Sequence, residues 1–234
     1  MMGPIRLQPD QIAQELTRFG EQLARGSQTL RALPEVHYGA SAKEEVWRED
    51  KVVLYRFVSE HKVTEKVPLL IVYALVNRPY MVDLQDDRSI VKSLLAAGHD
   101  VYLIDWGYPD ASDRFLTLDD YINGYIRQCV NAVRKRCDVA AINLLGICQG
   151  GAFSICYTSL YPATVKNLIT MVTPVDFQTP DNMLSHWTQD MDVDAMVDTI
   201  GNVPAELMNW CYLTLKPYRL LQQKYVGLTD ILDN

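Results

Sequence analysis

The residues of this chain best suited to chemistry lie in the run Gly146-Ile147-Cys148-Gln149-Gly150. A cysteine thiolate is a strong nucleophile that can accept an acyl group and form a covalent intermediate. In a sharp strand-to-helix turn the nucleophile has a strained backbone, and the residues two before and two after it must be small. Gly146 and Gly150 meet this requirement. The spacing therefore predicts a nucleophile elbow with Cys148 at its apex.

The sequence on either side of this run has the form that an elbow needs. An apolar stretch precedes it at 140–145, and a helical pattern follows it at 152–157. A cysteine between glycines is also typical of a small buried side chain in an ordinary turn. The strand before Cys148 and the helix after it favour the catalytic interpretation.

An elbow of this kind also needs an oxyanion hole and a base. We expect one backbone donor at Gln149, directly after the nucleophile, and a second at Val76 or Asn77, in the loop after the first parallel strand. A thiol nucleophile commonly uses a histidine that is oriented by a carboxylate. Only His186 follows Cys148, and it does not follow a strand. The sequence thus predicts the nucleophile and the oxyanion donors but no base.

Apolar runs at regular spacing indicate the elements that position this turn. Residues 51–58 predict an early antiparallel strand. Continuous apolar runs predict strands buried on both faces of a parallel sheet, at 68–76, 100–105, 141–145 and 167–172. Helical patterns fill the gaps at 88–97 and 118–136, the second with a capping box at its start, made by Thr117 and Asp120.

This alternation of strands and helices predicts an α/β protein with the α/β-hydrolase fold, a mostly parallel sheet whose third parallel strand leads into the elbow. We expect an N-terminal amphipathic helix region at 1–40, an incomplete α/β-hydrolase core at 41–174 and a partial cap or lid at 175–234. The last strands of the sheet, with a catalytic aspartate and histidine, are expected to be missing from the chain.

Composition disfavours several other classes of function. The 234 residues carry a formal net charge of −7, so a basic face for nucleic acid is not expected. No apolar run approaches the ~20 residues that cross a bilayer, and no signal peptide is indicated. The five cysteines are odd in number and show no C-x-x-C spacing, which predicts neither a disulfide framework nor a metal site. We expect a cytoplasmic protein with reduced thiols and no cofactor.

Several long segments resemble the catalytic subunit of class III polyhydroxyalkanoate synthases, which work with a second subunit. The similar segments are 69–81, 101–109, 118–122, 145–151 and 171–177. The resemblance implies transfer of (R)-3-hydroxyacyl groups from coenzyme A thioesters to a growing polyester, with Cys148 as the attachment point. It also implies a place at the surface of polyester granules. Members of the family continue further and carry a catalytic aspartate and histidine on later strands, for which this sequence has no counterpart.

Two other interpretations stay open at this stage. A cysteine-dependent hydrolase of the thioesterase or dienelactone hydrolase type shares the elbow, although the segments 77–80 and 105–107 disfavour it. An inactive fragment would instead bind a partner through its sheet and N-terminal helix. The chemistry of cysteine favours the synthase, because exchange of one thioester for another keeps the acyl group activated, whereas serine would hold it as a more stable oxygen ester.

Overall fold

The structure is a computed structural model in which Thr17 and residues 38–39, 41–180 and 182–215 are described. The chain divides into two compact units, one formed by His37–Asn202 and the other by the residues on either side of it. The described part of the second unit contains helix α7 (Ala205–Leu215). The helix expected at the N-terminus lies outside the described residues apart from Thr17, and the domain boundaries expected at 40 and 174 stay a prediction.

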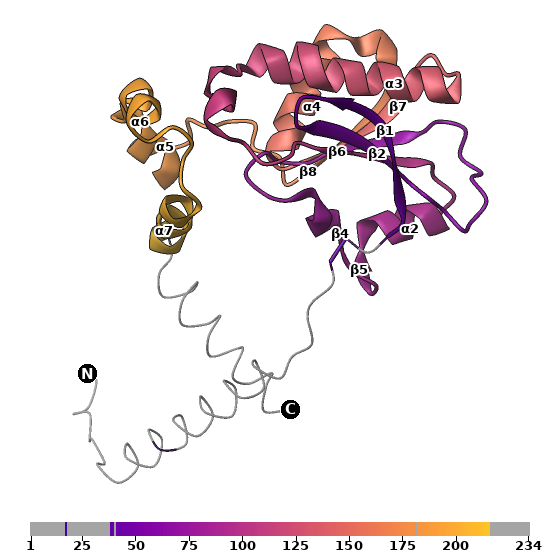
Figure 1. The fold of residues 1–234 in the computed structure, drawn as a ribbon, viewed down its shortest axis with the longest axis horizontal. Helices are drawn as coiled ribbons and strands as arrows, with labels where there is room; N and C mark the ends of the chain where they lie inside the picture. The colour runs from indigo at the N-terminus through magenta and orange to yellow at the C-terminus, as the bar shows by residue number, and fades with distance from the viewer. Residues whose placement is uncertain (1–16, 18–37, 40, 181, 216–234) are drawn as a thin grey trace, which may run out of the picture. The chain divides into compact units, whose positions relative to one another are not determined.

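A six-stranded sheet forms the centre of the larger unit, in the order β1-β2-β6-β3-β7-β8 (Figure 1). Strand β2 (Val52–Phe57) is antiparallel to both of its neighbours, β1 (Lys43–Glu49) and β6 (Val101–Asp105). The remaining pairs are parallel and add β3 (Leu69–Val72), β7 (Ile142–Ile147) and β8 (Val165–Met171). This topology confirms the mostly parallel sheet of the α/β-hydrolase fold, with the elbow after its third parallel strand.

Side chains alternate between the two faces of this sheet, and both faces are buried. In β3, Leu70 and Val72 belong to one core, and Leu69 and Ile71 belong to the other. Helices close the two cores from opposite sides (Figure 1). The first core is covered by α3 (Arg127–Cys137) and α4 (Gln149–Leu160), and the second by α2 (Ile90–Ala96). A strand covered on both faces needs apolar side chains at every position, which explains the continuous apolar runs.

The helix expected at 118–136 forms with a change of type near its start. Its first part, Asp120–Ile126, is π-helical, and the α-helix α3 follows directly. The expected capping box is present, because Asp120 Oδ2 accepts the Thr117 amide at 2.7 Å and the Thr117 hydroxyl accepts the Asp120 amide at 3.4 Å. The shorter helix α2 is capped at its start by Ser89, whose hydroxyl accepts a hydrogen bond from the amide of Lys92.

Strand β8 departs from the expectation of burial on both faces. It is the edge strand of the sheet over the residues that are described, and it pairs with β7 only. Ile169 and Met171 are 47% and 39% exposed. An apolar run gives a buried strand only where neighbouring elements cover it, so the expectation is wrong for β8 and holds for the strands inside the sheet.

The remaining described elements are short. Strands β4 (Asp83–Gln85) and β5 (Arg88–Ser89) form a small antiparallel pair before α2. Single 3₁₀ turns lie at Pro79–Val82, Ala111–Phe115 and Pro162–Thr164. After β8 come the helices α5 (Met183–Gln189) and α6 (Val193–Ile200). None of the helices that the structure describes has the length and apolarity to cross a membrane.

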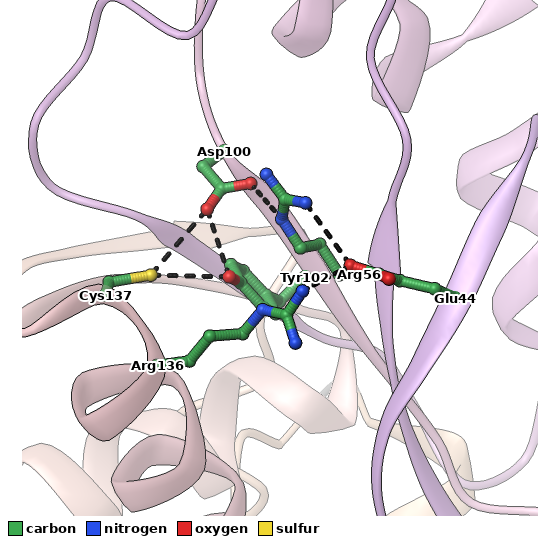
Figure 2. Close-up of polar contacts among 6 residues, drawn as sticks. All are labelled: Glu44, Arg56, Asp100, Tyr102, Arg136 and Cys137. Atoms are coloured by element: carbon green, nitrogen blue, oxygen red, sulfur yellow. Dashed lines mark hydrogen bonds and ion pairs between the residues drawn. The ribbon is translucent and has the colours of Figure 1, made fainter.

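Figure 2 shows a polar network around Asp100. Asp100 precedes β6, so the network lies at the amino ends of the parallel strands, opposite to the elbow. Asp100, directly before β6, accepts hydrogen bonds from Arg56 Nε at 2.7 Å and from the Tyr102 hydroxyl at 3.0 Å. The Cys137 thiol at the end of α3 lies 3.7 Å from the same carboxylate, and burial raises the pKa of that thiol. Glu44 on β1 joins the network by accepting a bond from Arg56 at 3.2 Å. These contacts tie β1, β2, β6 and α3 together, which indicates a structural role.

Replacement of Asp100 by alanine is expected to destabilise the fold. The change removes the carboxylate that accepts hydrogen bonds from Arg56 and Tyr102, so both donors lose this partner. We expect the free energy of unfolding to fall by about 1–3 kcal/mol. Urea denaturation followed by circular dichroism measures this quantity. Asp86→Ala is the matched control, because the Asp86 side chain is 86% exposed and pairs with Lys92 at the surface. Equal midpoints for the two variants would show that the network does not stabilise the fold.

Candidate active site

The turn between β7 and α4 has the geometry of a nucleophile elbow. Cys148 has φ 55° and ψ −127°, a conformation that non-glycine residues rarely adopt. Its amide donates to the Met171 carbonyl at 2.9 Å, and its own carbonyl accepts the Gly151 amide at 2.9 Å. These two bonds hold the strained residue between the end of β8 and the first turn of α4. The half-buried Cys148 therefore lies at the carboxyl edge of the parallel strands.

Close backbone packing explains why the residues around Cys148 are glycines. A Cβ on Gly146 would lie 2.5 Å from the Gly151 Cα. A Cβ on Gly150 would collide with the Val72 carbonyl, lying 2.6 Å from its carbon. Gly151 is restricted as well, because a Cβ there would lie 2.7 Å from Thr173 Cγ2. The structure thus supports the small-residue requirement predicted for Gly146 and Gly150 and adds Gly151, which the sequence pattern did not single out.

The expected oxyanion donors lie at the same edge of the sheet. Gln149 is the first residue of α4, where a backbone N–H has no acceptor within the helix. Val76 and Asn77 belong to the loop that follows β3, and Val76 is 58% exposed. Over the described part of the chain, neither the Val76 amide nor the Asn77 amide donates a hydrogen bond. All three residues can therefore offer an amide to a ligand, and their assignment to an oxyanion hole stays a prediction.

Two side-chain contacts anchor the loop after β3 to the residues that follow β6. Trp106 Nε1 donates to the Tyr73 carbonyl at 3.0 Å. Arg78 donates to the Gly107 carbonyl at 2.6 Å, and its guanidinium stacks on the Tyr108 ring at 3.9 Å. The first contact indicates an architectural role for Trp106. The contacts of Arg78 connect the loop after β3 to the loop after β6.

The Tyr73 side chain lies close to Cys148, a neighbour that sequence analysis missed. Both side chains are half-buried and pack against the second core. Burial, and then the negative charge that Cys148 can carry, raises the pKa of Tyr73. The position of Tyr73 directly after β3 is the signal that would have pointed to it, because strand ends meet at this edge.

The histidines that the structure describes do not contact the Cys148 thiol through a hydrogen bond. His186 lies on α5, and its Nε2 is 3.0 Å from the Pro180 carbonyl oxygen. His99 lies two residues before β6 and therefore at the opposite end of the parallel strands from Cys148. Their positions agree with the expectation that neither is the catalytic base.

None of the other four cysteines lies in a strand-to-helix turn. All five thiols are free. Burial raises the pKa of Cys129 and of Cys137, both on α3. Cys156 is exposed on α4, and Cys211 belongs to α7 in the other unit. Cys148 alone combines partial exposure, a strained backbone and neighbouring free amides, which makes it the candidate nucleophile.

Comparison with known proteins places this geometry in a family. Residues 67–229 match the alpha/beta hydrolase fold. The chain is 57% identical over 235 residues to the poly(3-hydroxyalkanoate) polymerase subunit PhaC of Allochromatium vinosum, with 100% of this chain and 66% of that protein covered. The protein of the same name from Thiocystis violacea is also 57% identical, over 234 residues, with the same coverage. The PhaC of Synechocystis sp. is 49% identical over 226 residues, covering 93% of this chain and 60% of its own.

The chain thus spans 66% of the length of the first two relatives, and the matches confirm the resemblance seen in the sequence. Solved structures similar to this one include a lipase from Bacillus licheniformis, with a TM-score of 0.45 and 17% identity over 77% of this chain and 65% of the lipase. An alpha/beta hydrolase fold protein from Burkholderia ambifaria has a TM-score of 0.46 and 14% identity, over 73% of this chain and 58% of its own.

Proposed function

Because the chain belongs to the alpha/beta hydrolase fold family, we propose that its elbow forms a covalent acyl-cysteine intermediate at Cys148 and that the chain is part of a poly(3-hydroxyalkanoate) polymerase subunit. The observation that carries this proposal is a cysteine, in place of the serine common at such elbows, at the strained apex between β7 and α4. Similarity to the PhaC polymerase subunits over the whole chain supports the same assignment.

In the first step, the Cys148 thiolate attacks the carbonyl carbon of an (R)-3-hydroxyacyl-coenzyme A thioester. The carbonyl oxygen becomes an oxyanion, which the amides of Gln149 and of Val76 or Asn77 stabilise. Collapse of the tetrahedral intermediate breaks the bond to the coenzyme A sulfur. Coenzyme A leaves as a thiolate and takes up the proton that Cys148 lost, so that one thioester replaces another.

Chain growth then joins two hydroxyacyl units. The hydroxyl oxygen of one unit attacks the thioester carbonyl of the next, forming an ester bond while a thiol is released with the hydroxyl proton. A thioester is a better acyl donor than an oxygen ester, so a cysteine nucleophile favours this transfer. A serine would form a more stable ester that suits hydrolysis.

The same chemistry suggests the location of the protein and the nature of its partner. A growing polyester attached to Cys148 would hold the protein at the surface of the insoluble product, and we propose this granule surface in a reducing cytoplasm as its location. The relatives are called polymerase subunits, which supports a second subunit as partner. The net charge of −7 disfavours nucleic acid as a partner.

A product assay tests the proposed function. The polymerase subunit that contains this chain is given (R)-3-hydroxybutyryl-coenzyme A, alone and with a second synthase subunit, and released thiol, insoluble polyester and free 3-hydroxybutyrate are measured. We expect released coenzyme A to match polyester, with little free acid. Free acid in equal amount to coenzyme A would indicate a cysteine hydrolase. Failure to release coenzyme A under either condition would favour a non-catalytic interaction module.

A further inference from the structure

The side chain of Gln149 connects the elbow to the loop that carries the second expected oxyanion donor. Its Oε1 accepts a hydrogen bond from the Leu75 amide at 3.1 Å. Leu75 directly precedes Val76, whose own amide is free over the described residues. We propose that Gln149 is a positioning residue, which offers its backbone N–H to the oxyanion and uses its side chain to set the Val76 amide beside it. This inference rests on the proposed function, because an oxyanion forms only in acyl transfer.

The anchoring of the loop shows why this single bond matters. Ala74 is 2% exposed, so the chain is fixed just before Leu75. On the far side, Arg78 is fixed by its bond to the Gly107 carbonyl at 2.6 Å. Between these points, the Gln149 bond determines which way the Leu75 amide faces, and this limits the direction of the following Val76 amide. Oxyanion donors must lie about 2.7–3.1 Å from the developing charge, so a small rotation of this peptide weakens them.

The contacts that anchor the loop connect it to two different parts of the protein. Trp106 and Arg78 connect the loop to β6 and to the residues after it. The Gln149 bond connects the loop to the elbow itself. Loss of the Gln149 bond therefore leaves the loop attached to the sheet while the spacing between the two donors becomes variable. We expect an effect on acyl transfer that exceeds the effect on stability.

Two reactions of the Cys148 thiol distinguish a positioning role of Gln149 from a purely structural role. Attack on a thioester passes through an oxyanion, whereas alkylation by iodoacetamide displaces iodide at a saturated carbon and forms none. Loss of a residue that positions an oxyanion donor therefore slows acylation by the thioester and leaves the rate of alkylation unchanged. The test variant is Gln149→Met, which keeps the length of the side chain and removes the acceptor. Gln128→Met is the matched control, because Gln128 is exposed on α3.

The experiment measures single-turnover modification of Cys148, with (R)-3-hydroxybutyryl-coenzyme A or iodoacetamide as the reagent. Peptide mass spectrometry after digestion separates Cys148 from the exposed Cys156, which can also react. We expect Gln149→Met to acylate about 10- to 100-fold more slowly, below the loss seen for removal of a whole oxyanion donor, and to be alkylated within about twofold of the parent rate. Gln128→Met should match the parent protein in both reactions. Melting temperatures of all three proteins establish that they are folded.

The outcomes distinguish this inference from the proposed function. Unchanged acylation of Gln149→Met overturns the positioning role and leaves the proposed function standing. An equal fall in acylation and alkylation also overturns it, because the side chain would then act on the thiol or on the fold. If the parent protein is alkylated at Cys148 but never acylated by the thioester, the proposed function fails and the inference falls with it.

Discussion

Replacement of Cys148 by alanine is expected to abolish acylation and polymer formation. The change removes the atom to which the acyl group binds, and loss of a nucleophile costs many orders of magnitude in turnover, about 10⁶-fold in a protease with a comparable covalent step. Cys129 and Cys137 cannot substitute, because Cys129 is buried and Cys137 belongs to the polar network at the opposite end of the parallel strands. Release of coenzyme A and formation of insoluble polyester are the two measurements.

Cys156→Ala is the matched control for this variant. Cys156 lies on α4, eight residues after Cys148, and its exposed thiol makes it the described cysteine most accessible to nonspecific acylation. We expect Cys156→Ala to keep the activity of the parent protein. Normal turnover of Cys148→Ala, or loss of activity in Cys156→Ala alone, would show that the nucleophile has been assigned to the wrong cysteine.

The second large effect is expected from Gly150→Ala. The added Cβ would collide with the Val72 carbonyl and would lie 2.7 Å from the Tyr73 carbonyl oxygen. Both atoms belong to backbone at the end of β3, which cannot move without disturbing the pairing of β3 with β7. We expect a loss of about 1–3 kcal/mol in the free energy of unfolding, from overpacking, and a near-complete loss of acylation. Thermal melting and single-turnover acylation measure the two effects.

Gly124→Ala provides the comparison for that variant. Gly124 lies in the π-helical segment Asp120–Ile126, and a Cβ there would meet no heavy atom within 4 Å. The same chemical change is therefore expected to be neutral or slightly stabilising, since alanine restricts the unfolded chain more than glycine does. If Gly150→Ala behaved like Gly124→Ala, the close approach of the elbow to β3 would be incorrect.

The sequence was most informative where local pattern and tertiary structure impose the same requirement. The parallel strands in the interior of the sheet are covered on both faces, so their burial is visible as unbroken apolar runs. The elbow is similar, because the backbone of Cys148 and the contacts of Gly150 restrict residue types at fixed spacing.

Edge strands were harder to predict for a physical reason. Strand β1 (Lys43–Glu49) was missed because it is rich in charge and carries an irregularity between Glu45 and Trp47, which breaks the alternation of side chains. Strand β8 was expected to be buried, although it is the outer strand of the described sheet. A run of apolar residues does not reveal whether a neighbour lies on each side.

The contacts that complete the candidate site join residues far apart in the chain. The bond from the Leu75 amide to Gln149 Oε1 spans 74 residues, and no spacing rule could indicate it. The same is true of the proximity of Tyr73 to Cys148, which arises because β3 and β7 pair in parallel and end at one edge. Gly151 could have been found, since it directly follows the elbow, but its restriction comes from Thr173 after β8.

The most direct test of the account is to locate the acyl group on the protein. After brief reaction with (R)-3-hydroxybutyryl-coenzyme A and acid quenching, the protein is digested and its peptides are analysed by mass spectrometry. The account predicts a hydroxybutyryl adduct on Cys148 that hydroxylamine removes, as it does a thioester. An adduct on any other residue, or turnover of the substrate with Cys148 unmodified throughout, would contradict it.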